Sequence, residues 1–214
     1  MLCLFDLDGT LIDSEHGITA CVKHALERLR VAIPSTEELR RWIGPPLRHS
    51  FAPLLGHDTA RVEAAVEHYH ERFDVHGWRE HSVYPGIEPL IGRLLDAGHQ
   101  LAIVTGKPHR HAEPILAQLP FGHAFLRLYG PDPSSAHSEK ADMIAAAMAD
   151  FGATAEETVM IGDRHFDIEG AVANRVRGIG VLWGFGSRTE LEQAGAAAIA
   201  ATPEELGTLL DPGA

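Results

Sequence analysis

The sequence predicts an α/β fold: a doubly wound parallel sheet into which a block of helices is inserted. The chain begins with an apolar run without alternation, residues 2–5, which is typical of a strand buried on both faces. Strand and helix patterns alternate from residue 84 onward. The segment between shows helical periodicity and no strand signal. We therefore expect a core domain of residues 1–14 and 82–214 and a separate helical domain, residues 15–81.

Composition excludes several classes of protein. The chain has 214 residues, of which 45% are apolar, enough for one sizeable core plus a small accessory domain. We expect neither a membrane span nor a secretory signal, because no apolar run has the required length or flanks. The two cysteines, Cys3 and Cys21, fall on buried positions and are expected to be thiols in a reducing cytoplasm. The formal charge of −12 argues against nucleic-acid and anionic membrane partners.

The helical segment divides into four expected helices. The first carries apolar residues at i, i+3, i+4 and i+7 from Ile18 to Leu29. Ser35 and Glu38 form a capping box for a second helix, which we expect to continue through Leu39, Trp42 and Ile43. A short third helix is expected over 47–55. Asp58 caps the fourth, whose buried face carries Val62, Ala65, Val66, Tyr69 and Phe73.

The rest of the chain reads as alternating strands and helices. Expected strands cover 101–104, 125–129, 158–161, 178–182 and 197–200. Expected helices cover 87–95, 112–119, a segment from Lys140, a short stretch over 167–174 and a last helix begun by a capping box at Thr202. Residues 130–135, rich in proline and serine, are expected to form a loop.

The first strand ends in two acids, Asp6 and Asp8. Open α/β sheets bind ligands at the carboxyl ends of their strands, and carboxylates two residues apart project to the same side. Unneutralised, the pair would repel, so it indicates a cation, most simply Mg²⁺. An ordinary Asp-Gly turn at Gly9 explains the tripeptide equally well. A calcium loop fits less well, because Thr10 stands where a third acidic or amide ligand belongs.

Other polar groups occur at later strand boundaries, namely Thr105, Lys140, Asp163 and Asp167. Each alone has an ordinary structural explanation as a helix cap, a solvated lysine or a turn residue. In a parallel sheet, however, the strand ends share one edge, so these groups are expected to converge there with the first acids. Such an order of groups is far less expected by chance than any one of them.

This order resembles the signatures of the haloacid dehalogenase superfamily and, within it, the aspartate-nucleophile phosphatases. Asp6-Leu-Asp8-Gly-Thr is similar to the first signature, Thr105-Gly106 to the second, Lys140 to the third and Gly162-Asp163-Arg-His-Phe-Asp167 to the fourth. The helical insertion is similar to the family's C1-type cap. Three further segments resemble the phosphoglycolate-phosphatase-like branch: Tyr84-Pro-Gly86, Ile43-Gly-Pro-Pro-Leu47 and Trp183-Gly-Phe-Gly-Ser187.

The resemblance implies a role for each residue. Asp6 would attack phosphorus and form an aspartyl phosphate, and Asp8 would exchange protons with the leaving group and water. The implied Mg²⁺ ligands are Asp6, the Asp8 carbonyl and Asp163, with Asp167 binding through water or orienting that shell. The implied phosphoryl ligands are Thr105, Gly106 and Lys140. The family often has serine where Gly106 stands, so here the backbone amide must serve.

The acid at Asp8 favours a phosphate ester, since the dehalogenases and the phosphonate-cleaving branch of the superfamily lack it. The latter uses a cap lysine, whereas residues 15–80 hold one lysine, Lys23. Phosphoglycolate is the family's suggestion, and a 5'-nucleotidase acting on nucleoside monophosphates is the competing interpretation. A sugar-phosphate mutase would also keep Asp8; it would need a bisphosphate activator and release no free phosphate.

A different class of protein, the phosphoacceptor signalling domain, shares the acidic pair, the threonine, the lysine and Mg²⁺. Its phosphorylated aspartate follows the third strand, where this chain has Asp132 between two prolines. Such domains are also shorter and have no helical cap.

Substrate choice is expected to lie in the cap, which closes over the site. Glu15 and His16 lie at the entry to that segment, and Arg48 follows its Gly-Pro-Pro loop. Arg48 suits a substrate carboxylate or second phosphate, although an ordinary surface arginine explains it equally well. The expected partner is a small phosphorylated metabolite; the sequence predicts no oligomeric state.

Overall fold

A computed structural model describes residues 1–131 and 139–211. The chain divides into two compact units. The core unit comprises Met1–Ile12 and Val83–Ala214, and the helical unit comprises Asp13–Ser82. Asp132 and most of the loop expected at 130–135 lie outside the described residues.

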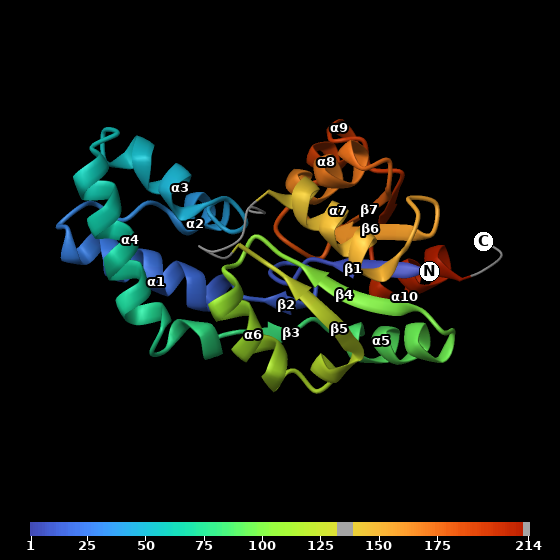
Figure 1. Cartoon of the computed structure of the whole chain (residues 1–214). Coiled ribbons are helices and arrows are strands. Elements are labelled where there is room, and N and C mark those ends of the chain that lie inside the picture. Colours follow the sequence, from blue (N-terminus) through green and yellow to red (C-terminus); the bar gives the residue numbers. More distant parts are fainter. Residues whose placement is uncertain (132–138, 212–214) are drawn as a thin grey trace. The chain divides into compact units, whose positions relative to one another are not determined.

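A six-stranded parallel sheet forms the centre of the core unit, in the order β5-β4-β1-β6-β7-β8 (Figure 1). Its strands are β1 (Leu2–Phe5), β4 (Gln100–Val104), β5 (Phe125–Tyr129), β6 (Thr158–Gly162), β7 (Arg177–Val181) and β8 (Ala198–Ala200). The first strand lies between β4 and β6, with Phe5 opposite Ile103 on one side and Ile161 on the other. The predicted parallel α/β fold is confirmed, with the acids after β1 at the middle of the sheet edge.

Helices cover both faces of this sheet (Figure 1). They are α5 (Ile87–Asp96), α6 (His109–Gln118), α7 (Lys140–Phe151), α8 (His165–Ala173), α9 (Arg188–Gln193) and α10 (Pro203–Leu210). Because side chains alternate along a strand, Leu2 and Leu4 pack with Met143 and Ile144 of α7, while Phe5 points to the other face. Each fully buried side chain of this kind contributes roughly 1.5–3 kcal/mol.

The helical unit contains α1 (Glu15–Arg28), α2 (Thr36–Arg40), α3 (Leu47–Leu54), α4 (Thr59–Phe73) and a short 3₁₀ turn, Gly77–Arg79. The predicted capping box of Ser35 and Glu38 is present, and Asp58 accepts hydrogen bonds from the first N–H groups of α4. The expectation that the second helix reaches Ile43 is wrong. The helix ends earlier because Gly44-Pro45-Pro46 disfavours helical backbone just before it.

Several short elements were not predicted, among them the 3₁₀ turns Gly77–Arg79 and Gly122–Ala124. The two connections between the units form the strands β2 (Ile12–Asp13) and β3 (Ser82–Val83), which pair as a two-stranded sheet. Helix α9 was missed, although Ser187 caps it by accepting from the Glu190 N–H. Both cysteines are buried and form no disulfide. Within residues 1–131 and 139–211, no helix has the length and apolarity needed to cross a membrane.

Candidate active site

The turn after β1 brings the first two acids to the sheet edge. The Asp6 N–H donates to the Ile161 carbonyl (2.9 Å), which ties the strand end to β6, and the Gly9 N–H donates to the Ile12 carbonyl (2.8 Å). Gly9 has φ +83°, and a Cβ there would overlap the Asp163 carboxylate. Glycine is therefore required both for the left-handed backbone and for the close approach of the two segments.

Three carboxylates meet at this edge. Ligand oxygens of Asp6, Asp163 and Asp167 lie within 4.8 Å of one another, and all three residues are buried. The Lys140 ammonium lies 2.9 Å from Asp6 Oδ1 and 2.6 Å from Asp167 Oδ1, and it donates to the Val104 carbonyl at 2.8 Å. One lysine thus contacts two of three clustered acids, so the cluster carries excess negative charge.

The pKa values of the site residues follow from their burial and from this excess of negative charge. Burial raises the pKa of Asp6 to about 6 against the lowering effect of Lys140, with Asp167 and Asp8 adding to the rise. Burial, followed by the charges of Asp167 and Asp6, holds the pKa of Asp163 well above its usual range. Burial would lower the pKa of Lys140, but Asp167 and Asp6 outweigh it and raise that pKa to about 12.

A divalent cation fits this donor set. Oδ1 of Asp6 and Oδ1 of Asp167 are buried and share the Lys140 ammonium, with no other partner among the described residues. Carboxylate oxygens are the hard ligands that Mg²⁺ prefers, and added positive charge would relieve the repulsion that raises the pKa values. The three carboxylates predicted from sequence to hold a metal therefore lie together, and the Asp8 side chain, which was predicted to transfer protons, lies outside this cluster.

The loop after β7 holds Asp163 in place. The Phe185 N–H donates to Asp163 Oδ2 at 2.8 Å, and the Thr10 hydroxyl lies 3.4 Å from Asp163 Oδ1. The indole N–H of Trp183 donates to the Thr10 carbonyl at 2.9 Å. In the sequence, the segment that begins at Trp183 stood out only by its resemblance to the family, and no role was predicted for Phe185 or Thr10.

Asp8 forms an ion pair with a second lysine of the site, Lys107. Lys107 Nζ lies 2.8 Å from Asp8 Oδ2. The lysine backbone N–H donates to the Thr105 hydroxyl at 3.2 Å, and Thr105 is buried while Gly106 is exposed. The sequence placed Thr105 and Gly106 after β4, where they are found, but it missed Lys107. Its position directly after these two residues was the available signal.

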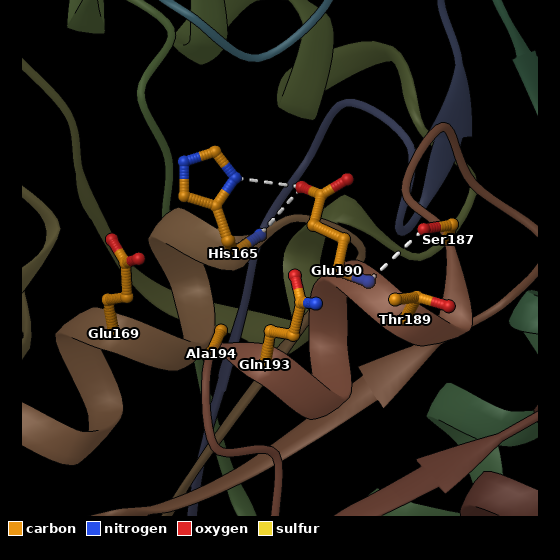
Figure 2. Close-up of a pocket in the computed structure, with 7 residues that line it drawn as sticks. All are labelled: His165, Glu169, Ser187, Thr189, Glu190, Gln193 and Ala194. Atoms are coloured by element: carbon orange, nitrogen blue, oxygen red, sulfur yellow. Dashed lines mark hydrogen bonds and ion pairs between the residues drawn. The ribbon is translucent and has the colours of Figure 1, made fainter.

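The start of α8 is tied to α9. Glu190 Oε1 accepts from Arg164 Nε at 2.8 Å. It also accepts from the His165 N–H (3.0 Å) and lies 2.8 Å from His165 Nδ1 (Figure 2). The Arg164 N–H donates to Asp167 Oδ2 at 3.1 Å. Burial alone would raise the pKa of Glu190, but the hydrogen bonds from His165 and Arg164 lower it to about 2. Glu190 was also missed from sequence.

Glu190 lines a pocket of about 400 Å³ at this place. Figure 2 shows the side chains around it. The pocket is lined by His165, Glu169, Ser187, Thr189, Glu190, Gln193 and Ala194. None of the residues predicted to carry the chemistry is among them. The carboxylate cluster, with its buried charges and fixed lysine, is therefore the better candidate active site than this pocket.

Two of the three residues expected to choose the substrate, Glu15 and Arg48, have partners within the helical unit. Arg48 makes a two-point ion pair with Glu63, at 2.6 and 2.7 Å. Glu15 lies 3.2 Å from Arg40, and His16 is exposed. The guanidinium of Arg48 is thus already matched by a carboxylate, which weakens it as a substrate ligand.

Comparison with known proteins identifies relatives over most of the chain. A family model described as haloacid dehalogenase-like hydrolase matches residues 3–181. A 5'-nucleotidase of Pseudomonas aeruginosa is 43% identical over 188 residues, which cover 88% of this chain and 85% of the nucleotidase. The tyrosine-protein kinase PtkA of Mycobacterium tuberculosis is 33% identical, covering 96% of this chain and 70% of the kinase.

Two further relatives bear on the chemistry. A phosphoglycolate phosphatase of Pseudomonas putida is 30% identical, covering 86% of this chain and 70% of that enzyme. The crystal structure of a predicted phosphatase from Clostridium acetobutylicum superposes with a TM-score of 0.91 at 36% identity, covering 98% of this chain and 97% of that one. The range matched by the family model, residues 3–181, includes Asp6, Lys140, Asp163 and Asp167.

Proposed function

We propose, since this chain belongs to the haloacid dehalogenase-like hydrolase family and is a phosphatase, that it hydrolyses a small organic phosphate monoester with the help of Mg²⁺. The observation that carries the proposal is the buried cluster of Asp6, Asp163 and Asp167 with Lys140 at the carboxyl end of the central strand. Such a cluster combines a nucleophile, a cation site and a phosphate ligand.

In the first step, an Asp6 carboxylate oxygen forms a bond to phosphorus while the bond from phosphorus to the ester oxygen breaks. The electron pair of the broken bond goes to the leaving oxygen, which takes a proton from Asp8. The Lys140 ammonium, the Thr105 hydroxyl and the Gly106 amide bind the phosphoryl oxygens and offset their charge. The product on the protein is an aspartyl phosphate.

In the second step, water attacks phosphorus and gives a proton to Asp8, and the bond between phosphorus and the Asp6 oxygen breaks. Inorganic phosphate leaves and Asp6 is regenerated. Asp8 suits both directions of proton transfer because its surroundings differ from those of Asp6. The contacts support this difference, since Asp6 lies among Asp163 and Asp167, whereas the Asp8 side chain is outside that cluster and is paired with Lys107.

Mg²⁺ would be held by Asp6, Asp163 and the Asp8 carbonyl, with Asp167 as a further ligand or an orienting group. When bound, it supplies positive charge to the phosphoryl oxygens and to the attacking carboxylate. The hard oxygen donors and the uncompensated charge of the three acids support this choice of ion.

Two substrate classes follow from the relatives. Similarity to the phosphoglycolate phosphatase suggests a small phosphorylated acid, whereas the higher identity to the 5'-nucleotidase favours a nucleoside 5'-monophosphate. With a net charge of −12, attraction of either anion depends on local cations such as Lys107 and Lys140. We place the protein in the cytoplasm, since Cys3 and Cys21 are buried and form no disulfide.

Phosphate release with Mg²⁺ tests the proposal, measured over a panel of phosphoglycolate, the nucleoside 5'-monophosphates and sugar phosphates. We expect the protein to release free phosphate from at least one ester without any partner kinase. Conversion of a sugar phosphate to its isomer, dependent on a bisphosphate and without free phosphate, would identify a mutase instead. A stable phosphoprotein that does not turn over would identify a signalling domain.

A further inference from the structure

We infer that Lys107 is a positioning residue for Asp8: it holds Oδ2 of that carboxyl group and leaves Oδ1 as the oxygen that exchanges protons during the reaction. The inference rests on the proposed function, in which Asp8 transfers protons to the leaving group and from water. It assigns a role to a lysine that none of the four family signatures includes.

The two oxygens of Asp8 are unlike. Oδ2 lies 2.8 Å from the Lys107 ammonium, and the two side chains are 11% and 7% exposed. An ion pair this short and this buried is strong and only weakly screened by salt. Oδ1 is also buried, yet it accepts no hydrogen bond within the described part of the chain. The oxygen without a partner is the one available to a leaving group or a water molecule.

The pair joins two rigid supports. The Lys107 N–H donates to the Thr105 hydroxyl, and a Cβ on Gly130 would come within 2.7 Å of the Lys107 carbonyl oxygen. The lysine is thus anchored where β4 and β5 end. Asp8 lies in the tight turn that the hydrogen bond from the Leu11 N–H to the Leu7 carbonyl (3.0 Å) closes. A side chain fixed between two such supports loses little freedom when the substrate binds.

The two lysines of the site therefore form ion pairs with different acids. Lys140 contacts Asp6 and Asp167, within the cluster that suits a cation. Lys107 contacts Asp8, whose side chain lies outside that cluster. Without Lys107, Asp8 would lose the contact that fixes its orientation, and a misdirected carboxyl group transfers protons less efficiently.

Leaving-group dependence separates this role from simple phosphate binding. An alkoxide needs a proton as it leaves, whereas p-nitrophenolate, a weak base, leaves without one. The ratio kcat/KM reports steps up to alcohol release and is therefore insensitive to the later hydrolysis of the aspartyl phosphate. We would measure it with p-nitrophenyl phosphate and with the most active alkyl ester of the metabolite panel.

Lys107→Met is expected to lower kcat/KM for the alkyl ester by about tenfold or more, a part of the roughly 10²–10⁴-fold that general acid–base catalysis contributes. The value for p-nitrophenyl phosphate should fall much less. Lys107→Arg, which keeps a cation, should restore most of the alkyl activity. In an Asp8→Asn background, Lys107→Met should have no further effect on the alkyl ester. Arg110→Met, which removes an exposed cation three residues away, is the matched control.

Equal falls for both esters, or the same loss in the Asp8→Asn background, would overturn the inference and make Lys107 a phosphate ligand. Unfolding curves of each variant monitor the fold, and Lys107→Gln replaces Lys107→Met in the same comparison if the latter does not fold. The wild-type enzyme tests the proposed function separately. If it releases no phosphate from any ester, the proposed function fails; if it is active and the two esters respond alike, only the Lys107 inference fails.

Discussion

The ammonium nitrogen of Lys140 lies 2.6 Å from Oδ1 of Asp167, in a place where both side chains are almost fully buried. The same nitrogen lies 2.9 Å from Oδ1 of Asp6. A buried lysine between two acids keeps its proton, as its raised pKa of about 12 indicates. Lys140 can therefore serve as a permanent positive charge next to the proposed nucleophile.

Lys140→Met should lower kcat by about 10²-fold or more, the usual cost of removing one group that stabilises transition-state charge. It should also destabilise the fold, because two buried carboxylates lose their partner. Steady-state kinetics and urea unfolding measure the two effects. Lys23→Met, in α1, is the control for loss of one lysine charge. Wild-type kcat in Lys140→Met would exclude Lys140 from the site.

Binding of Mg²⁺ should change the thermal stability of the protein, which can be measured without turnover. Mg²⁺ added to chelator-treated protein should raise the Tm, because an ion that binds the folded state stabilises it and relieves repulsion among the three acids. Asp163→Asn should reduce this rise, whereas Asp96→Asn, at an exposed position of α5, should leave it unchanged. An equal rise in Asp163→Asn and wild type would argue against the proposed cation site.

Two glycines allow a matched test of close packing at the site. Gly9 (φ +83°) and Gly98 (φ +76°) both have left-handed backbone, but a Cβ on Gly9 would meet the Asp163 carboxylate while one on Gly98 would meet nothing. Both alanine variants should lose roughly 1–2 kcal/mol of stability to backbone strain. Only Gly9→Ala should also lose activity, since Asp163 must move. Full activity in Gly9→Ala would contradict this account.

The Glu190 carboxylate is expected to stabilise the folded protein to a degree that depends on pH. Its pKa falls from 4.5 to about 2 in the folded protein, because hydrogen bonds from His165 and Arg164 favour the carboxylate. A lowered folded-state pKa adds stability that is complete above pH 4.5 and is lost as the pH falls toward 2. The unfolding free energy of wild type should therefore exceed that of Glu190→Gln most at neutral pH, and the difference should shrink in acid.

Urea unfolding at a series of pH values measures this difference. Glu192→Gln, on the same helix but at an exposed position, should show no such trend. A difference between wild type and Glu190→Gln that is constant with pH would mean that charge plays no part in the link between α8 and α9.

The family and the fold class predicted from the sequence are confirmed, for reasons that are local. The run Leu2–Phe5 is buried throughout, as its lack of alternation requires. The caps at Ser35 and Asp58 act within three residues of the helices that they begin. Patterns of this kind depend on neighbours in sequence, so they can be recognised without the rest of the chain.

Contacts between distant segments could not be predicted in this way. Lys107 meets Asp8 across about a hundred residues, and Glu190 reaches Arg164 from a helix that was not expected. The position of Lys107 after Thr105 and Gly106 indicates the sheet edge, but it does not identify Asp8 as its partner, and nothing near Glu190 in sequence identifies Arg164. The same applies to Arg48, whose suggested role was to bind substrate but whose guanidinium is paired with Glu63.

The central claim is that Asp6 carries the phosphoryl group, and the most direct test is to trap it there. The protein is quenched in acid during turnover of p-nitrophenyl phosphate with Mg²⁺, and its peptides are weighed by mass spectrometry. The account predicts one phosphoryl group on the peptide that contains Asp6, and neither this adduct nor turnover in a folded Asp6→Asn variant. A phosphoryl group on another residue, or an active Asp6→Asn enzyme, would contradict it.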